Sequence, residues 1–138
     1  MSVNLFYIKN IGFAISLKTV LFTKSITKIS KLPGLTPPLI SFYLYSDNVV
    51  PVYNLGHFFN ENNTQFVNLI FLTNSNKLIS FAADDLDMAD NYSLESCKEA
   101  SSLSFVEKDN LLIYKGKKHF IIDSKKVFYA KELLLSES

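Results

Sequence analysis

The stretch Leu32–Leu55, LPGLTPPLISFYLYSDNVVPVYNL, carries the most informative pattern in this 138-residue chain. It opens with three of the four prolines, and because proline fixes φ and donates no backbone hydrogen bond, these residues predict a connector. The bulky residues 39–45 predict a strand, and Ser46-Asp47-Asn48 predicts a turn. Val49 to Tyr53 then reads as a second strand, in which Pro51 favours an edge position or a bulge.

Short strands also dominate the sequence on both sides of this stretch. Before it, strands are expected at 3–8, 13–17, 20–22 and 25–29, with the tetrapeptide KNIG (9–12) as a tight turn. After it we expect a helical turn and loop at 54–63, a hairpin of 66–72 and 77–83, an unpatterned acidic segment at 84–100, and strands at 103–106, 111–114 and 119–122. Asp123 is a plausible N-cap for a closing helix over 124–135, with Val127, Ala130 and Leu134 facing the body. This order predicts a mainly-β barrel or sandwich.

Composition limits the range of functions. Apolar residues make up 48% of the chain, which is enough for a sizeable core, and the formal net charge is only +1, which gives no basic face for nucleic acid. The chain contains no arginine, so bidentate clamps on phosphate or carboxylate are not expected. The single Cys97 excludes an internal disulfide. With neither a signal peptide nor an apolar run near 20 residues, a cytoplasmic protein without membrane insertion is expected.

The residue types that support catalysis do not form a recognisable site. His57 and His119 are the only histidines, and both are expected to be ordinary surface or rim residues. The acidic run 84–90 lacks the central glycine and distal glutamate of a calcium loop, and is expected to be a solvated turn. The basic run 115–118, KGKK, reads as a hairpin tip. We therefore predict no catalytic residue, no metal, no cofactor and no enzymatic activity.

The order of elements resembles the CheW family, the adaptor proteins of bacterial chemotaxis. The resemblance rests on Leu32-Pro33, on PxxI at 37–40, on VVPVYNL at 49–55, and on the later segments VNLIFL, LISFAAD and HFIID. It runs from about Val3 to Leu134. It implies two small, packed, five-stranded β-barrels (SH3-like subdomains) and a short C-terminal helix. The two interleaved barrels would form a single domain over residues 1–138.

The same resemblance implies a non-catalytic adaptor that couples a CheA-type histidine kinase to methyl-accepting chemoreceptors. Family members usually carry an arginine–glycine pair where Ser46 and Asp47 stand, and that arginine is associated with receptor and kinase contacts. Serine removes its charge and its donors, so any ion pair made there is lost. The candidate partner-binding residues are Ser46, Asp47, Asn48, Val50 and Tyr53.

Two alternatives remain open at this point. The missing arginine favours a divergent CheW-like scaffold of another signalling or motility system that binds only the kinase. A small ligand-binding or enzymatic β-barrel would instead need polar groups that converge in a pocket.

Overall fold

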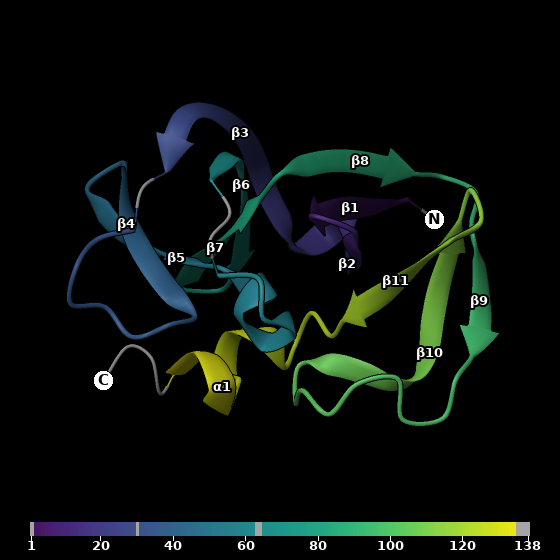
Figure 1. The fold of residues 1–138 in the computed structure, drawn as a ribbon. Helices are drawn as coiled ribbons and strands as arrows, with labels where there is room; N and C mark the ends of the chain where they lie inside the picture. Colours follow the sequence, from purple (N-terminus) through teal and green to yellow (C-terminus); the bar gives the residue numbers. More distant parts are fainter. Residues whose placement is uncertain (1, 30, 63–64, 135–138) are drawn as a thin grey trace.

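The computed structural model describes residues 2–29, 31–62 and 65–134, which form two curved sheets packed against each other (Figure 1). The first sheet has five strands in the order β3-β6-β7-β5-β4. Its strands are β3 (Val20–Ile29), β4 (Leu39–Tyr45), β5 (Asn48–Tyr53), β6 (Phe66–Asn74) and β7 (Lys77–Ala83). Neighbouring strands are antiparallel except for β5 and β7, which run parallel.

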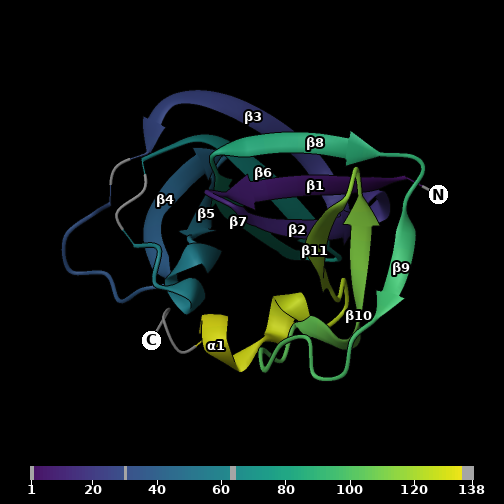
Figure 2. The same cartoon turned by 45° about the vertical axis from the view of Figure 1, so that its right-hand side comes forward.

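The second sheet has six strands in the order β8-β1-β2-β11-β10-β9. Its strands are β1 (Val3–Ile8), β2 (Ile11–Ser16), β8 (Asp85–Ala89), β9 (Ser93–Ser96), β10 (Val106–Tyr114) and β11 (Lys117–Ile122). Strand β8 lies at one edge and β9 at the other, and the chain bends from one to the other through Asp90–Tyr92 (Figures 1 and 2). The sheet therefore curls until its two edges are joined by the chain, with no strand pairing between them among the described residues.

The mainly-β prediction is confirmed, but neither sheet is a closed barrel. The second sheet has a sixth strand because the acidic segment, expected to be a turn and loop, forms β8 and β9. In β8, Asp85, Asp87 and Met88 are exposed, Leu86 is half-buried and Ala89 is buried, so the strand lies at the surface and packs through only part of its length. The expected strands 20–22 and 25–29 are one continuous strand, β3.

The closing helix is much shorter than expected. Asp123 does accept hydrogen bonds at Oδ1 from the amides of Lys125 and Lys126, but only a 3₁₀ turn, η3 (Val127–Tyr129), follows it. Ala130 is extended and ends that turn, and the helix α1 covers only Lys131–Leu134. Leu133 is buried in place of Leu134, and the predicted last residue, Leu135, lies outside the described residues.

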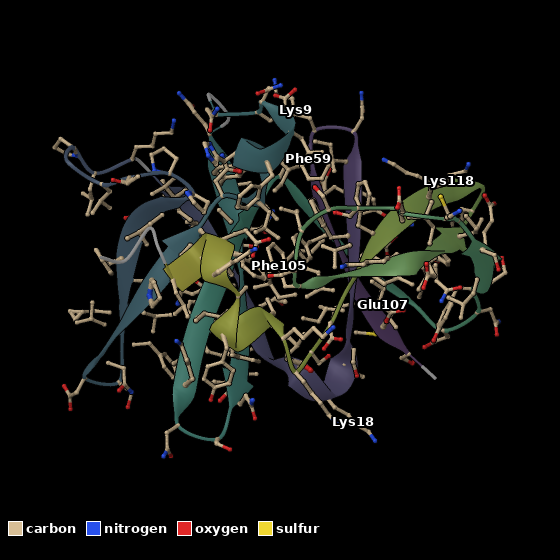
Figure 3. All side chains as sticks on the ribbon, turned by 90° about the horizontal axis from the view of Figure 1, so that it is seen from below. Lys9, Lys18, Phe59, Phe105, Glu107 and Lys118 are labelled. Carbon is tan, nitrogen blue, oxygen red and sulfur yellow. The ribbon has the colours of Figure 1, made fainter. Side chains whose placement is uncertain are left out.

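The main core lies between the two sheets. Alternate residues of β1 and β2 point toward the other sheet, where Phe6 stacks on Phe13 with ring centroids 5.0 Å apart and on Phe81 of β7 at 5.8 Å. Phe105 is also fully buried in this cluster and lies beside the C-terminal helical segment (Figure 3). Residues of β1, β2, β8 and β10 also line the inside of the curved second sheet, where the buried apolar side chains are Leu5, Ala14, Ala89 and Leu112.

Gly12 and Pro51 both lie in positions that differ from those expected from the sequence. The turn predicted at KNIG falls on Lys9, whose φ is 54°, and Asn10, whereas Gly12 lies within β2. A Cβ at Gly12 would lie 2.6 Å from Cδ2 of His119, so glycine is needed there to admit the imidazole ring. Pro51 is not on an edge strand, because β5 lies between β4 and β7; the irregular pairing falls instead between Leu39 and Ser41 of β4.

Candidate partner-binding surface

The β4–β5 hairpin carries the residues that the sequence singled out. Ser46 and Asp47 form its two-residue turn with φ values of 47° and 66°, the left-handed pair that matches the twist of a tight hairpin. The side-chain amide of Asn48 donates to the carbonyl of Ser46 at 3.2 Å. All three residues are exposed, so the predicted turn is confirmed and a partner could reach it.

Val50 and Tyr53 do not belong to that surface. Their exposed fractions are 0% and 1%, and both lie in the core between the sheets. Both side chains point into the core and are not accessible to a partner. Strand β5 lies between β4 and β7, and its pairing with β7 covers Val52 and Tyr53. The edge strands of this sheet are β3 and β4.

The outer face of the hairpin carries exposed apolar residues that the sequence pattern did not reveal. Phe42, Leu44 and Val49 are exposed to 43%, 68% and 64%, and Leu44 and Val49 are directly opposite each other across the two strands. Together with the turn at Ser46-Asp47, these three side chains form what we call the hairpin patch. Asp47 is the one charged residue in the hairpin, so this patch is apolar with a single carboxylate at its tip.

The inner face of the same hairpin is fixed to the sheet by aromatic rings. Tyr43 meets the ring of Phe71 edge-on with centroids 5.4 Å apart, and Tyr45 lies 4.9 Å from the ring of Phe22. Phe22 in turn stacks on Phe71 at 4.3 Å. Because aromatic rings anchor the inner face of the hairpin, the hairpin patch is held in one orientation.

An unexpected polar feature, a buried histidine, lies inside the six-stranded sheet. His119 is completely buried, which corrects its assignment to the surface. Its Nδ1 lies 3.2 Å from the carbonyl of Leu112, and because a carbonyl only accepts, Nδ1 carries the proton. The bare Nε2 therefore accepts from the hydroxyl of Tyr7 at 2.8 Å. Burial lowers the pKa of His119 and outweighs its backbone hydrogen bonds, which raise it.

The buried imidazole predicts a stability that depends on pH. The unfolded chain takes up a proton near pH 6.5, whereas folded His119 does so only at lower pH, so acid favours the unfolded state. Between about pH 7.5 and 5.5 we expect urea titrations to show stability falling by up to about 1.4 kcal/mol per pH unit. His119→Gln should flatten this slope and His57→Gln should keep it. An unchanged slope in His119→Gln would contradict the assignment.

The remaining candidate groups do not converge on a site. His57 is half-buried, and its Nδ1 lies 3.0 Å from the side-chain oxygen of Asn62. Asp84 accepts from the amide of Lys9, and the basic run turns at Lys115 and Gly116 as predicted. Within the part of the chain that the structure describes, no group of three histidine, cysteine or carboxylate side chains could hold a metal ion. No helix there is long and apolar enough to cross a membrane.

The architecture of this chain is similar to that of a solved structure. No protein-family model matches the sequence, and no curated protein matches it either. Among solved structures, the crystal structure of the scaffolding protein TtCheW from Thermoanaerobacter tengcongensis is similar, with a TM-score of 0.70 over 95% of this chain and 94% of that chain. The fold is CheW-like. The sequence identity is 13%, so the likeness is one of fold.

Proposed function

We propose that this chain is a non-catalytic, cytoplasmic adaptor of chemotaxis signalling that binds its partners through the hairpin patch. By its CheW-like fold, the partners are a CheA-type histidine kinase and methyl-accepting chemoreceptors, and the interleaved sheets act as a single domain over residues 1–138. The observation that carries this proposal is the exposure of Phe42, Leu44 and Val49 on a hairpin fixed from below by aromatic rings. Contiguous apolar side chains on an ordered surface mark interaction sites.

The chemistry of the hairpin patch defines how it would bind. Ser46 stands where the family's contact arginine is expected, so the contact would depend on burial of apolar area and not on an ion pair. Asp47 is the only charged residue within the β4–β5 hairpin itself. Binding should therefore change by only about twofold between low salt and about 0.5 M NaCl, because screening acts on charges and not on apolar contacts. A much steeper decrease in affinity would point to an ionic interface elsewhere.

Point variants test the hairpin patch directly. Leu44→Ser combined with Val49→Ser should weaken binding to the kinase regulatory domain by about tenfold or more, as expected when central apolar contacts are lost. The measurement is calorimetry with the purified kinase domain and with a receptor-tip fragment. Met88→Ser is the matched control, because Met88 is 50% exposed on β8 of the other sheet.

The outcome for each partner separates the alternatives. Binding to both partners supports the coupling role, whereas binding to the kinase alone supports the divergent scaffold. Binding to neither would overturn the proposal. The enzymatic alternative gains no support from the cavity of about 490 Å³ lined by Tyr7, Asp85 and Asp87, because His119 lies behind Tyr7 and does not line it.

A further inference from the structure

The six-stranded sheet has an open cavity at one end of its inner face. Two of the four buried apolar residues on that face are alanines, Ala14 and Ala89, and the half-buried side chains of Val3, Tyr92 and Ile121 pack against this cluster. At the end of the sheet where β1 and β10 begin and β2 and β11 end, a cavity of about 440 Å³ opens to the surface. This volume lies within the range of small-molecule sites, which often occupy the mouths of β-barrels.

The walls of this cavity are mainly apolar. Leu112 and Ile121 line it from β10 and β11, and Val3 lines it from the start of β1. Leu94, 61% exposed on β9, stands at its rim, and Tyr92 adds an aromatic ring. These walls suit a ligand that has a compact apolar or aromatic group.

The mouth of the cavity carries two carboxylates that lack a cationic partner. Glu107, exposed at the start of β10, and Asp123, just after the end of β11, both line it. Oδ1 of Asp123 accepts from the amides of Lys125 and Lys126, so a ligand would meet its Oδ2. Figure 3 shows Glu107 beside the strands of the six-stranded sheet. Burial, and then the neighbouring charge of Asp123, raise the pKa of Glu107. Among the described residues the one recorded ion pair is Lys118–Glu95, so Lys125, which also lines the mouth, is not paired with either carboxylate.

From this arrangement we propose that the cavity binds a small organic ammonium ion. Its apolar body would lie between Val3, Leu112 and Ile121, and its ammonium group would donate hydrogen bonds to Glu107 and Asp123. The ligand class is an alkyl or aralkyl primary amine, because a neutral alcohol of the same shape brings no charge to the carboxylates and an acid is repelled by them. The site lies in the other sheet from the hairpin patch and does not depend on the function proposed above.

Three matched probes test this ligand class on the full chain. ¹H–¹⁵N NMR titrations with phenethylammonium, 2-phenylethanol and phenylacetate share one ring and differ in charge. We expect phenethylammonium to shift the amides around Ala14, Leu94 and Ile121, with an affinity at least about tenfold higher than that of the alcohol. Equal affinity for all three probes, no shifts up to about 10 mM amine, or shifts confined to the opposite end around Asp85 and Lys117 would overturn the proposal.

Variants at the mouth complete the test. Glu107→Gln should reduce the affinity for phenethylammonium by about tenfold while leaving that for 2-phenylethanol unchanged. Asp109→Asn is the matched control, because Asp109 is exposed on the same strand and does not line the cavity. Leu94→Ser should weaken the amine and the alcohol together. If Glu107→Gln and Asp109→Asn reduced the affinity for phenethylammonium equally, that affinity would depend only on the net charge of the protein, and the proposed site would be wrong.

Discussion

Replacing Phe6 with alanine is expected to lower the free energy of unfolding by about 3–5 kcal/mol, the usual cost of removing a fully buried aromatic ring. Phe6 has no exposed surface and stacks on Phe13 of its own sheet and on Phe81 of the other. The ring therefore holds the two sheets together. Because a domain of this size is stable by only about 5–15 kcal/mol, much of the folding free energy would be lost. Urea unfolding followed by circular dichroism measures the change.

Tyr129 provides a matched control for the loss of an aromatic ring. It is 64% exposed, and its recorded ring contact is with Nζ of Lys77, 5.5 Å from the ring centroid. Tyr129→Ala should therefore cost at most about 1 kcal/mol. Equal losses in the two variants would show that the packing between the sheets does not determine the stability.

Gly12→Ala is expected to destabilise the protein by about 1–3 kcal/mol, although alanine is only one methyl group larger. The new Cβ would lie 2.6 Å from Cδ2 of His119. The imidazole is buried and held by hydrogen bonds at both nitrogens, to Leu112 and Tyr7, so it cannot move aside without breaking one of them. Chemical denaturation measures the loss, and a shift in the NMR signals of His119 would report its displacement.

A double-mutant cycle separates this clash from a loss of backbone freedom. In the Gly12→Ala, His119→Ala double variant the ring is absent, so the added methyl group should cost much less than it does beside His119. A clash thus predicts a coupling energy of about 1 kcal/mol or more between the two positions. Simple additivity would show that the close approach at Gly12 does not limit stability.

Local sequence patterns predicted the bounds of a strand well where a tight turn directly follows it. The strands 3–8 and 39–45 have the predicted bounds, because Lys9-Asn10 and Ser46-Asp47 force the chain to reverse. The sequence DLDMA of β8 was missed, although its acidic and apolar residues alternate, because its charge suggested a solvated turn. The helix predicted from residue 124 begins only at Lys131, because the extended Ala130 separates the 3₁₀ turn η3 from α1. Glu132 of α1 accepts from the amide of Ser104 at 2.7 Å and also from its hydroxyl.

Of the candidate partner-binding surface, only the turn at Ser46-Asp47 could be predicted from the sequence. In β4 nearly every residue is bulky, so the sequence does not reveal which face meets Phe71 and which leaves Phe42 and Leu44 exposed. That choice depends on the other strands of the sheet. The burial of His119 has a similar origin. It follows from the parallel register that places His119 opposite Gly12, and a lysine-rich neighbourhood in the sequence gives no sign of it.

The order of strands in the second sheet also matters while the ribosome is making the protein. All five strands of the first sheet lie between Val20 and Ala83, so they can pair as soon as that part of the chain has emerged. Strands β1 and β2 emerge earlier, but β2 has to wait for β11, which ends at Ile122. Until then the β1–β2 hairpin keeps one edge unpaired, a state that favours aggregation. The β1–β2 hairpin therefore waits longer for its last neighbouring strand than any strand of the first sheet.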